Sequence, residues 1–320
     1  MKRISVFIFF IFAFCLFHGQ VFSQTLTEYN TLAGQVMSKG IDGISNIAAS
    51  IIADSFTPMT HYKKGDFVVT GVPAWFDVKK AYDSPDIKGK DFTGIAGGIG
   101  AGYALTDDFM LYGIAAFIKM NGDLYGDYYG SYSPPLKADT DYSLFSFFAG
   151  AGYDIFSGSW SMPVFAGLSV QHYNAKINLP GQSITVPIAG TLETEFSGSG
   201  LLAGATAGIA LSKTFLDSIR ITPYFLYMLS FNKPELNNKT TITSGSSLSH
   251  ESKTKGEQVS AGMLGLCLTL LSEKNYSVSV SLGGLITSSS GYYNKKFLNG
   301  LEMKSAVAAL TWQTNFEKAE

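Results

Sequence analysis

The sequence predicts an all-β fold: a transmembrane, antiparallel, up-and-down β-barrel of about ten strands, with twelve as the alternative count, after a short N-terminal helical segment. Three observations predict it. Only 15% of the 320 residues are charged, while 14% are aromatic and 34 are glycine. After the first 23 residues, no apolar run reaches the roughly 18 residues of a membrane-spanning helix. Along much of the chain, apolar residues alternate with small or polar ones at a period of two.

The first 23 residues have the three parts of a secretory signal peptide. Lys2 and Arg3 form a positive start, residues 6–17 are apolar, and Ser23 ends a stretch suited to cleavage. The alternative is a retained membrane anchor, but an apolar run of about a dozen residues is short of the roughly 20 that a spanning helix needs. We therefore expect residues 1–23 to be removed on export.

The exported chain has an unusual balance of residues. The formal net charge of the whole sequence is −2, so no basic excess is available to recruit nucleic acid. Cys267 is the one cysteine after the signal peptide, which leaves no partner for an intramolecular disulfide. Few charges and many glycines and aromatics are atypical of a soluble domain. These features together predict a β-barrel in the cell outer membrane, with membrane lipid as its surroundings.

Residues 24–59 do not follow the barrel pattern. Apolar residues recur there at helical spacing, which predicts a short amphipathic helix ending before Pro58. They are Ile41, Ile44, Ala48, Ile51 and Ile52. Two interpretations stay open: a plug in the barrel lumen or a helix lying on the inner leaflet, and a periplasmic lead-in without a further role. Residues 60–320 are then the transmembrane barrel.

The clearest strand covers residues 92–105. Its odd positions carry Thr93, Ile95, Gly97, Ile99, Ala101, Tyr103 and Leu105, and its even positions are almost all glycine or alanine. A helix would scatter these residues around its axis, whereas a strand places them on two faces. The bulky face is expected to meet lipid and the bare face the lumen.

The same alternation predicts ten strands in all. They cover residues 66–78, 92–105, 109–120, 142–155, 160–173, 196–212, 219–231, 258–271, 276–288 and 303–316. The connections between them alternate between short ones and long polar ones. Outer-membrane barrels have short periplasmic turns, long external loops and both termini inside, which an even strand count satisfies.

Aromatic residues fall at the short-turn ends of these strands, where a membrane interface is expected. They are Tyr103, Phe109, Tyr153, Trp160, Phe215, Tyr276, Trp312 and Phe316. With these and the final strand ALTWQTNF (309–316), residues 66–316 resemble the bacterial outer-membrane β-barrel proteins. The resemblance implies insertion by the outer-membrane assembly machinery, although four residues follow the usual terminal aromatic. It matches no particular subfamily.

Motifs that carry chemistry are not found. The histidines of the exported chain, His61, His172 and His250, lie far apart, and no metal-ligand spacing or nucleophile motif accompanies them. We therefore expect no catalytic residues, no metal, no cofactor and no enzymatic activity. An outer-membrane hydrolase is the least favoured alternative.

The predicted lumen face is mostly uncharged. Arg220 and Asp154 are its clearest charges, and both lie near the inner rim, so the opposing charge rings of an ion-selective pore are not expected. We predict instead an apolar lumen pocket formed by Phe117, Phe148, Phe165, Leu202, Leu226, Met228 and Met263. The corresponding function is a narrow, porin-like conduit or binding protein for a small hydrophobic solute. The alternative is a structural or surface-interaction barrel whose external loops contact partners.

Overall fold

The computed structural model gives the course of the chain from residue 37 to residue 315 with several gaps. It describes residues 37–38, 40–41, 43–45, 47–56, 62–80, 87–126, 136–156, 159–184, 190–216, 218–244, 246–256, 258–272, 276–286, 291–293, 296–298 and 302–315. The predicted signal peptide lies outside the described residues. The described residues between 37 and 56 are α-helical and are called the inner helix below; the rest of the chain is mainly β-strand.

The ten predicted strands are all present. They are β1 (Asp66–Lys80), β2 (Ile87–Ala104), β3 (Phe109–Gly126), β4 (Leu136–Asp154), β6 (Pro163–Ile184), β7 (Gly190–Ala210), β9 (Ile219–Ser230), β12 (Ser260–Ser272), β13 (Tyr276–Ile286) and β16 (Glu302–Asn315). Two short strands, β5 (Trp160–Ser161) and β8 (Ser212–Phe215), pair with each other and extend β6 and β7 at the inner end.

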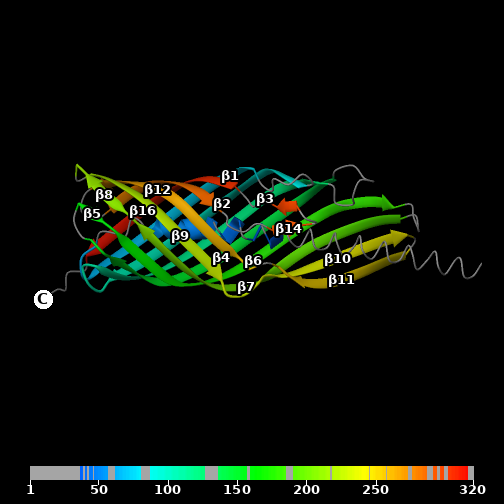
Figure 1. The fold of residues 1–320 in the computed structure, drawn as a ribbon, viewed down its shortest axis with the longest axis horizontal. Helices are drawn as coiled ribbons and strands as arrows, with labels where there is room; N and C mark the ends of the chain where they lie inside the picture. The colour runs from blue at the N-terminus through cyan, green and yellow to red at the C-terminus, as the bar shows by residue number, and fades with distance from the viewer. Residues whose placement is uncertain are drawn as a thin grey trace, which may run out of the picture.

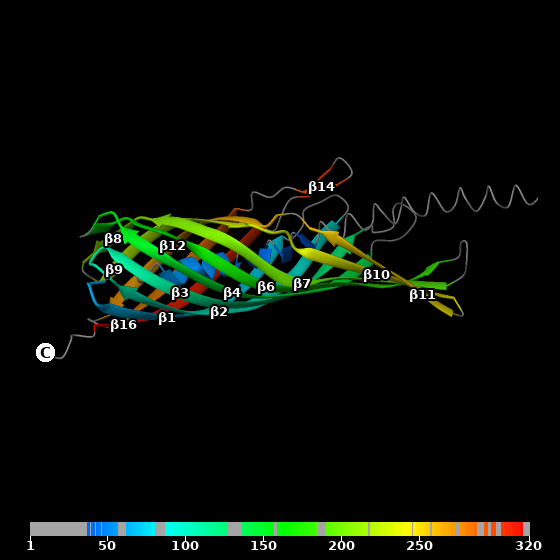
Figure 2. The same cartoon turned by 90° about the horizontal axis from the view of Figure 1, so that it is seen from below.

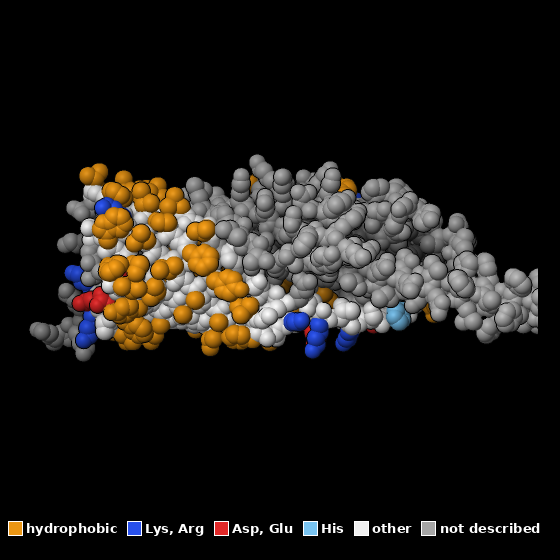
Figure 3. All heavy atoms as spheres, viewed as in Figure 1, with side chains coloured by type: hydrophobic (Ala, Val, Ile, Leu, Met, Phe, Trp, Pro, Cys, Tyr) orange, Lys and Arg blue, Asp and Glu red, His pale blue; other side chains and the backbone are white. Residues whose placement is uncertain are grey.

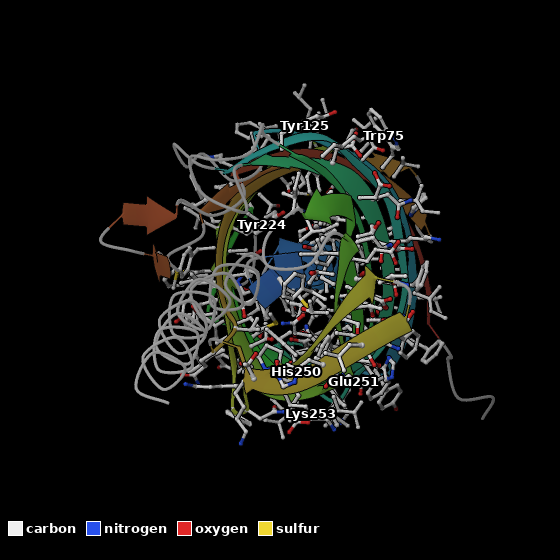
Figure 4. All side chains as sticks on the ribbon, turned by 90° about the vertical axis from the view of Figure 1, so that its right-hand side faces the viewer. Trp75, Tyr125, Tyr224, His250, Glu251 and Lys253 are labelled. Carbon is white, nitrogen blue, oxygen red and sulfur yellow. The ribbon has the colours of Figure 1, made fainter. Side chains whose placement is uncertain are left out.

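Within the described residues, these ten strands form a closed antiparallel ring. Each pairs with its neighbour in the chain order just given, from β1–β2 through β4–β6 to β13–β16. The β7–β9 ladder and the β1–β16 ladder complete the circuit. Figure 1 shows the tilted strands from the side, and Figure 4 looks along the barrel axis. The predicted antiparallel up-and-down architecture is confirmed, with ten strands in the ring and further strands, such as β10, attached to it.

The external connection over residues 232–257 differs from the prediction. It was expected to be a loop, but β10 (Glu235–Ser244) and β11 (Ser246–Lys255) form a hairpin of two ten-residue strands. β10 also pairs with β7 beyond the point where β9 ends. The hairpin therefore continues the wall past the ring, and Figure 2 shows it projecting from one end of the barrel. A second, smaller hairpin, β14 (Gly291–Tyr293) with β15 (Lys296–Leu298), lies in the predicted loop 289–302.

The outward face of the barrel carries an apolar belt. Trp75, Ile99, Phe145, Leu168 and Leu201 are among its most exposed side chains. Figure 3 shows this band over the half of the barrel that holds the short turns, with lysines and arginines gathered beyond its edges. A broad exposed apolar band on a closed barrel is stable only in a lipid bilayer, and it is the arrangement of outer-membrane barrels. The protein is a transmembrane β-barrel of the outer membrane.

Aromatic side chains mark the inner edge of the belt, as predicted. Tyr103, Tyr153, Trp160 and Phe215 are all exposed there. The ammonium group of Lys213 lies 4.2 Å from the centre of the Trp160 ring, so a cation covers the indole at the level expected for lipid headgroups. The predicted counterpart Phe316 lies outside the described residues.

Candidate functional site: a lumen filled by the inner helix

The inner helix runs along the barrel axis. Figures 1 and 4 show it inside the wall. Its first described turn contacts the outer end: a Cβ placed on Gly40 would collide with the ring of Tyr142, near the start of β4. Its last turn contacts the inner end, where Phe56 packs on Tyr112 and Phe165 with ring centroids 4.8 and 4.4 Å apart. The chain therefore descends the lumen from outside to inside before β1 begins.

The outer half of the helix packs into an apolar cluster. Met37, Ile41, Ile44, Ile47 and Ile51 are at most 2% exposed. Their partners on the wall, all buried, include Val72, Ile118, Met120, Tyr142, Leu144, Tyr173, Leu202, Met228 and Leu236. This apolar burial favours the docked helix, since each fully buried aliphatic side chain contributes about 1.5–3 kcal/mol relative to exposure.

A second apolar cluster lies toward the inner end. Ala49, Ile52, Ala53 and Phe56 of the helix form it together with wall residues. Those wall residues are Val68, Ala104, Met110, Tyr112, Ile114, Phe148, Phe165, Ala210, Tyr224, Leu226 and Cys267. The helix therefore contacts apolar wall residues all along its described length.

Polar contacts fix the helix at two heights. The Ser45 hydroxyl donates to the Gln171 side-chain oxygen at 3.0 Å, and the Gln171 amide in turn lies 3.2 Å from the Met228 sulfur. Nearer the inner end, the Tyr224 hydroxyl donates to Oδ1 of Asp54 at 3.0 Å. Figure 4 shows Tyr224 inside the barrel beside the helix. These bonds join the helix to β6 and β9 and set its height in the lumen.

Several buried hydroxyls at the same interface lack a protein partner. Those of Ser50 and Ser55 on the helix, and of Tyr112, Ser146 and Thr206 on the wall, have no hydrogen bond among the described residues. A buried hydroxyl left without a partner costs about 1–3 kcal/mol unless water reaches it. The interface between the helix and the wall is thus mostly apolar, but several of its hydroxyl groups lack a hydrogen-bond partner. These hydroxyls lower the net stability of the docked helix.

The charges of the lumen lie near the inner end. Arg220 and Asp154 are 3% and 6% exposed, which confirms that both face inward. Oδ1 of Asp154 accepts the backbone N–H of Met162 at 2.9 Å, so this carboxylate closes the turn between β4 and β6. Just before β1, burial and then the nearby carboxylates of Asp154 and Asp108 raise the pKa of Tyr62, so its phenol stays neutral.

The predicted pocket residues are divided between the two clusters. Leu202 and Met228 belong to the outer cluster, and Phe148, Phe165 and Leu226 belong to the inner one. The structure places the helix against them, so they do not line an open space. The side chain of Met263 lies outside the described residues, although its backbone pairs with Leu226.

The inward placement of Phe117 was wrong. Its side chain is 46% exposed and belongs to the lipid-facing belt. The alternate residues of β3, such as Ile114, Ala116 and Ile118, face the lumen and contact the clusters around the helix. Sequence reasoning missed them because β3 is apolar on both faces, so its period-two pattern is weak. A strand with two apolar faces was itself the signal that something apolar fills the lumen.

The side chains that could carry chemistry remain separate. No cluster of three or more His, Cys, Asp or Glu residues that could hold a metal ion occurs among the described residues. His172 and His250 are exposed on β6 and β11, and Cys267 is buried, with its sulfur 3.6 Å from Oγ1 of Thr269. In the part of the chain that the structure describes, no helix combines the length and apolarity needed to cross a membrane.

Comparison with known proteins gives structural likeness only. No protein-family model matches the sequence, and no curated protein matches it. Among solved structures, the translocator domain of the autotransporter NalP from Neisseria meningitidis is similar at 10% identity and a TM-score of 0.48, covering 88% of this chain and 99% of that one. The outer membrane protease OmpT from Escherichia coli is similar at 12% identity and a TM-score of 0.45, covering 78% and 96%. A deletion mutant of TodX, described as a monoaromatic hydrocarbon channel, has 9% identity and a TM-score of 0.47, covering 80% and 91%.

Proposed function

We propose that this outer-membrane barrel is a conduit for a small apolar solute and that the inner helix closes it at rest. One observation carries the proposal: the helix occupies the lumen through apolar contacts along its described length, from Met37 to Phe56. In small barrels, the side chains of the strands themselves can fill the interior. Here the filling is a separate segment whose displacement would leave an apolar channel.

The nature of the exposed channel follows from the wall residues. With the helix displaced, Leu144, Leu202 and Met228 would line the outer half, and Phe148, Phe165 and Leu226 the inner half. Among the described wall residues, the inward charges are confined to the inner end. Such a lining favours an uncharged apolar solute over ions, since nothing in it replaces an ion's hydration shell.

The polar part of the interface supports a helix that can move. Its hydroxyls without protein partners at Ser50, Ser146 and Thr206 would be hydrated once the helix shifted. The free energy gained by hydrating these hydroxyls offsets part of the free energy lost when the apolar side chains of the helix leave the wall. The free energy needed to displace the helix is therefore smaller than the loss of apolar burial alone.

The test uses a disulfide that holds the helix in the lumen when oxidised and releases it when reduced. Ile51 lies against Gly98 of β2, so cysteines at these two positions in a Cys267→Ser background should form a disulfide that holds the helix. Uptake of a fluorescent apolar dye by proteoliposomes should fall several-fold on oxidation and recover on reduction. The matched control places the second cysteine at Gly97, on the outer face of the same strand, where no lock can form.

Two results would count against the conduit. Equal dye uptake by locked and reduced protein would show that the helix does not gate the solute. Equal uptake by empty liposomes would show that the barrel carries none. We further propose that the protein is not an enzyme. The resemblance to outer-membrane β-barrel proteins implies the membrane lipid and the outer-membrane assembly machinery as its partners.

A second candidate is a surface-interaction role for the β10–β11 hairpin. Its exposed side chains are almost all polar, including His250, Glu251 and Lys253, which Figure 4 shows on the hairpin. The hairpin extends the wall beyond β9 and so presents a pleated polar surface outside the bilayer. Deleting residues 237–253 should abolish cell adhesion while leaving dye uptake unchanged if this role is the relevant one.

A further inference from the structure

The wall of the barrel has a gap at its outer edge. β7 pairs with β10 from Thr191 to Ser197 and with β9 from Gly204 to Ala210. Between these two ladders, β7 residues 198–203 pair with no strand on that side, within the part of the chain that the structure describes. Backbone groups of a sheet that lack ladder partners must be satisfied in another way.

A single side chain satisfies part of this edge. The Asn232 amide oxygen accepts the N–H of Ala203 at 2.8 Å, and its NH₂ group donates to the carbonyl of Leu201 at 2.7 Å. Asn232 thus takes the place of a strand residue, next to the bond from Phe231 N–H to the Ala203 carbonyl at 2.7 Å. The gap is held open by defined hydrogen bonds and is a built feature of the wall.

The inner side of the gap is closed by Tyr173 of β6. Its hydroxyl accepts the N–H of Glu235 at 2.8 Å and donates to the Glu235 carbonyl at 3.1 Å. The ring passes over Gly200, where an added Cβ would lie 3.1 Å from the hydroxyl, so a side chain at this position would crowd the tyrosine. Outside Tyr173, a pocket of about 460 Å³ remains.

The pocket lies where the apolar belt meets the polar outer surface. Its lining is Tyr173, Ser199, Gly200, Leu201, Asn232, Lys233, Glu235 and Lys255. Leu201 and the adjacent Phe231 are 61% and 63% exposed and mark the top of the belt. Lys233 and Lys255 lie just beyond, at the neck of the β10–β11 hairpin, where Lys255 pairs with Glu235 in the ladder.

The two lysines differ from three other lysines toward the outer end. Lys137, Lys176 and Lys239 each have a carboxylate within 4.0 Å. Lys233 and Lys255 form no ion pair with any described residue, and the carboxylate of Glu235 reduces the local charge without pairing with either. Two free ammonium groups at the mouth of a pocket, above an apolar surface, suit a ligand with an anionic head and an alkyl tail.

We propose that this pocket binds the phosphorylated headgroup of an outer-leaflet glycolipid. The phosphate lies between Lys233 and Lys255, and an acyl chain lies over Leu201 and Phe231 in the membrane. The site is distinct from the lumen, and it does not require the solute conduit. It would anchor the hairpin neck to the membrane surface and keep the gap in the wall sealed.

The experiment measures lipid binding to the full-length protein by native mass spectrometry in a neutral detergent. The probe is an acylated glucosamine disaccharide carrying two phosphates, titrated beside the same lipid without phosphates. The phosphorylated lipid should bind at least about tenfold more tightly, and Lys233→Gln/Lys255→Gln should remove most of that difference. Both lysines are exposed, so the variant should fold normally.

The matched control is Lys239→Gln/Lys253→Gln, which removes the same charge from the same hairpin outside the pocket. This control should retain binding. An equal loss of lipid binding in both variants would mean that overall charge accounts for the binding, and it would overturn the site. Equal binding of the phosphorylated and unphosphorylated lipids would also overturn it. Displacement of the lipid by equimolar inorganic pyrophosphate would show a site for free anions and overturn the headgroup assignment.

Discussion

At the scale of single residues, inward glycines provide the room that the helix occupies. A Cβ at Gly152 would lie 2.6 Å from the ring of Phe56, and one at Gly98 would lie 2.5 Å from a methyl group of Ile51. Real Cβ atoms do not approach other carbons so closely, so only glycine fits at these positions. The close approach of the helix thereby explains the glycine at position 98 on the inward face of β2.

Replacing Gly98 with leucine should therefore displace the helix. The larger side chain would overpack the contact with Ile51, and overpacking of this kind costs about 1–3 kcal/mol. Limited proteolysis of protein in liposomes should cut residues 37–56 faster in Gly98→Leu than in the native sequence. Gly97→Leu, on the outer face of the same strand, is the matched control and should be cut no faster. Equal cleavage of both variants would refute the contact.

The Asp54–Tyr224 hydrogen bond is the second residue-scale contact to test. Tyr224→Phe removes the donor and leaves Oδ1 of Asp54 without it, which should lower the free energy of unfolding by about 1–3 kcal/mol. Tyr227→Phe is the control, because Tyr227 lies on the lipid face of the same strand. Urea refolding titrations in lipid vesicles measure both. A loss confined to Tyr227→Phe would contradict the assignment of the two faces.

Residue facing could be predicted from the sequence only where the two faces of a strand differ. In β4 and β9 the lumen assignments of Phe148 and Leu226 are confirmed. Polar residues of the same parity, Ser146 in β4 and Thr222 in β9, mark the inward face of these strands. In β3 both faces are apolar, so the alternation of residues along the strand does not distinguish the lumen face from the lipid face. Phe117 was therefore assigned to the wrong face. The inward residues of β3 pack in the apolar clusters around the helix, whereas its outward residues face lipid, so both sets are apolar.

At the scale of elements, the membrane-spanning strands were predictable and their extensions were not. β4 begins at Leu136, although the alternation suggested residue 142, and β10 and β11 were expected to be loop. Outside the bilayer, neither face of a strand needs to be apolar, and hydrogen bonds alone continue the ladder. Periodicity therefore detects the part of a strand that lies in lipid and not the part beyond it.

The depth of β2 in the membrane gives an element-scale prediction. Ile99 is among the most exposed residues of the belt, so Ile99→Lys should lower the free energy of unfolding by about 2–4 kcal/mol. Thr93→Lys, on the same face nearer the outer end, should cost about 0–1 kcal/mol. Refolding titrations in lipid vesicles compare the two. Similar costs would mean that the belt does not cross the hydrocarbon core at Ile99.

At the scale of the whole molecule, the orientation of the barrel follows from its two unequal ends. His250 lies on the long hairpin, and Asp107 lies in the short turn after β2. In a Cys267→Ser background, His250→Cys should react with an impermeant maleimide on intact cells, while Asp107→Cys should react only after the outer membrane is permeabilised. Labelling of Asp107→Cys on intact cells would invert the orientation.

The closed barrel and its helix together make the last prediction, on ion conductance. The lumen of the full-length protein is occupied along the helix, so planar bilayers should show no large, steady conductance. Deleting residues 25–59 removes the core of both apolar clusters and should produce stable open steps with weak ion selectivity, since the described inward charges lie only at one end.

A variant of unchanged length separates loss of the plug from damage caused by deletion. Ile44→Asp/Ile51→Asp places two charges in the outer cluster, where their desolvation is uncompensated, so the helix should undock and conductance should flicker. Far-ultraviolet circular dichroism should show that the strands persist in both variants. A silent deletion variant with intact strands, or a full-length protein that conducts steadily, would mean that wall side chains and not the helix determine whether the lumen is open.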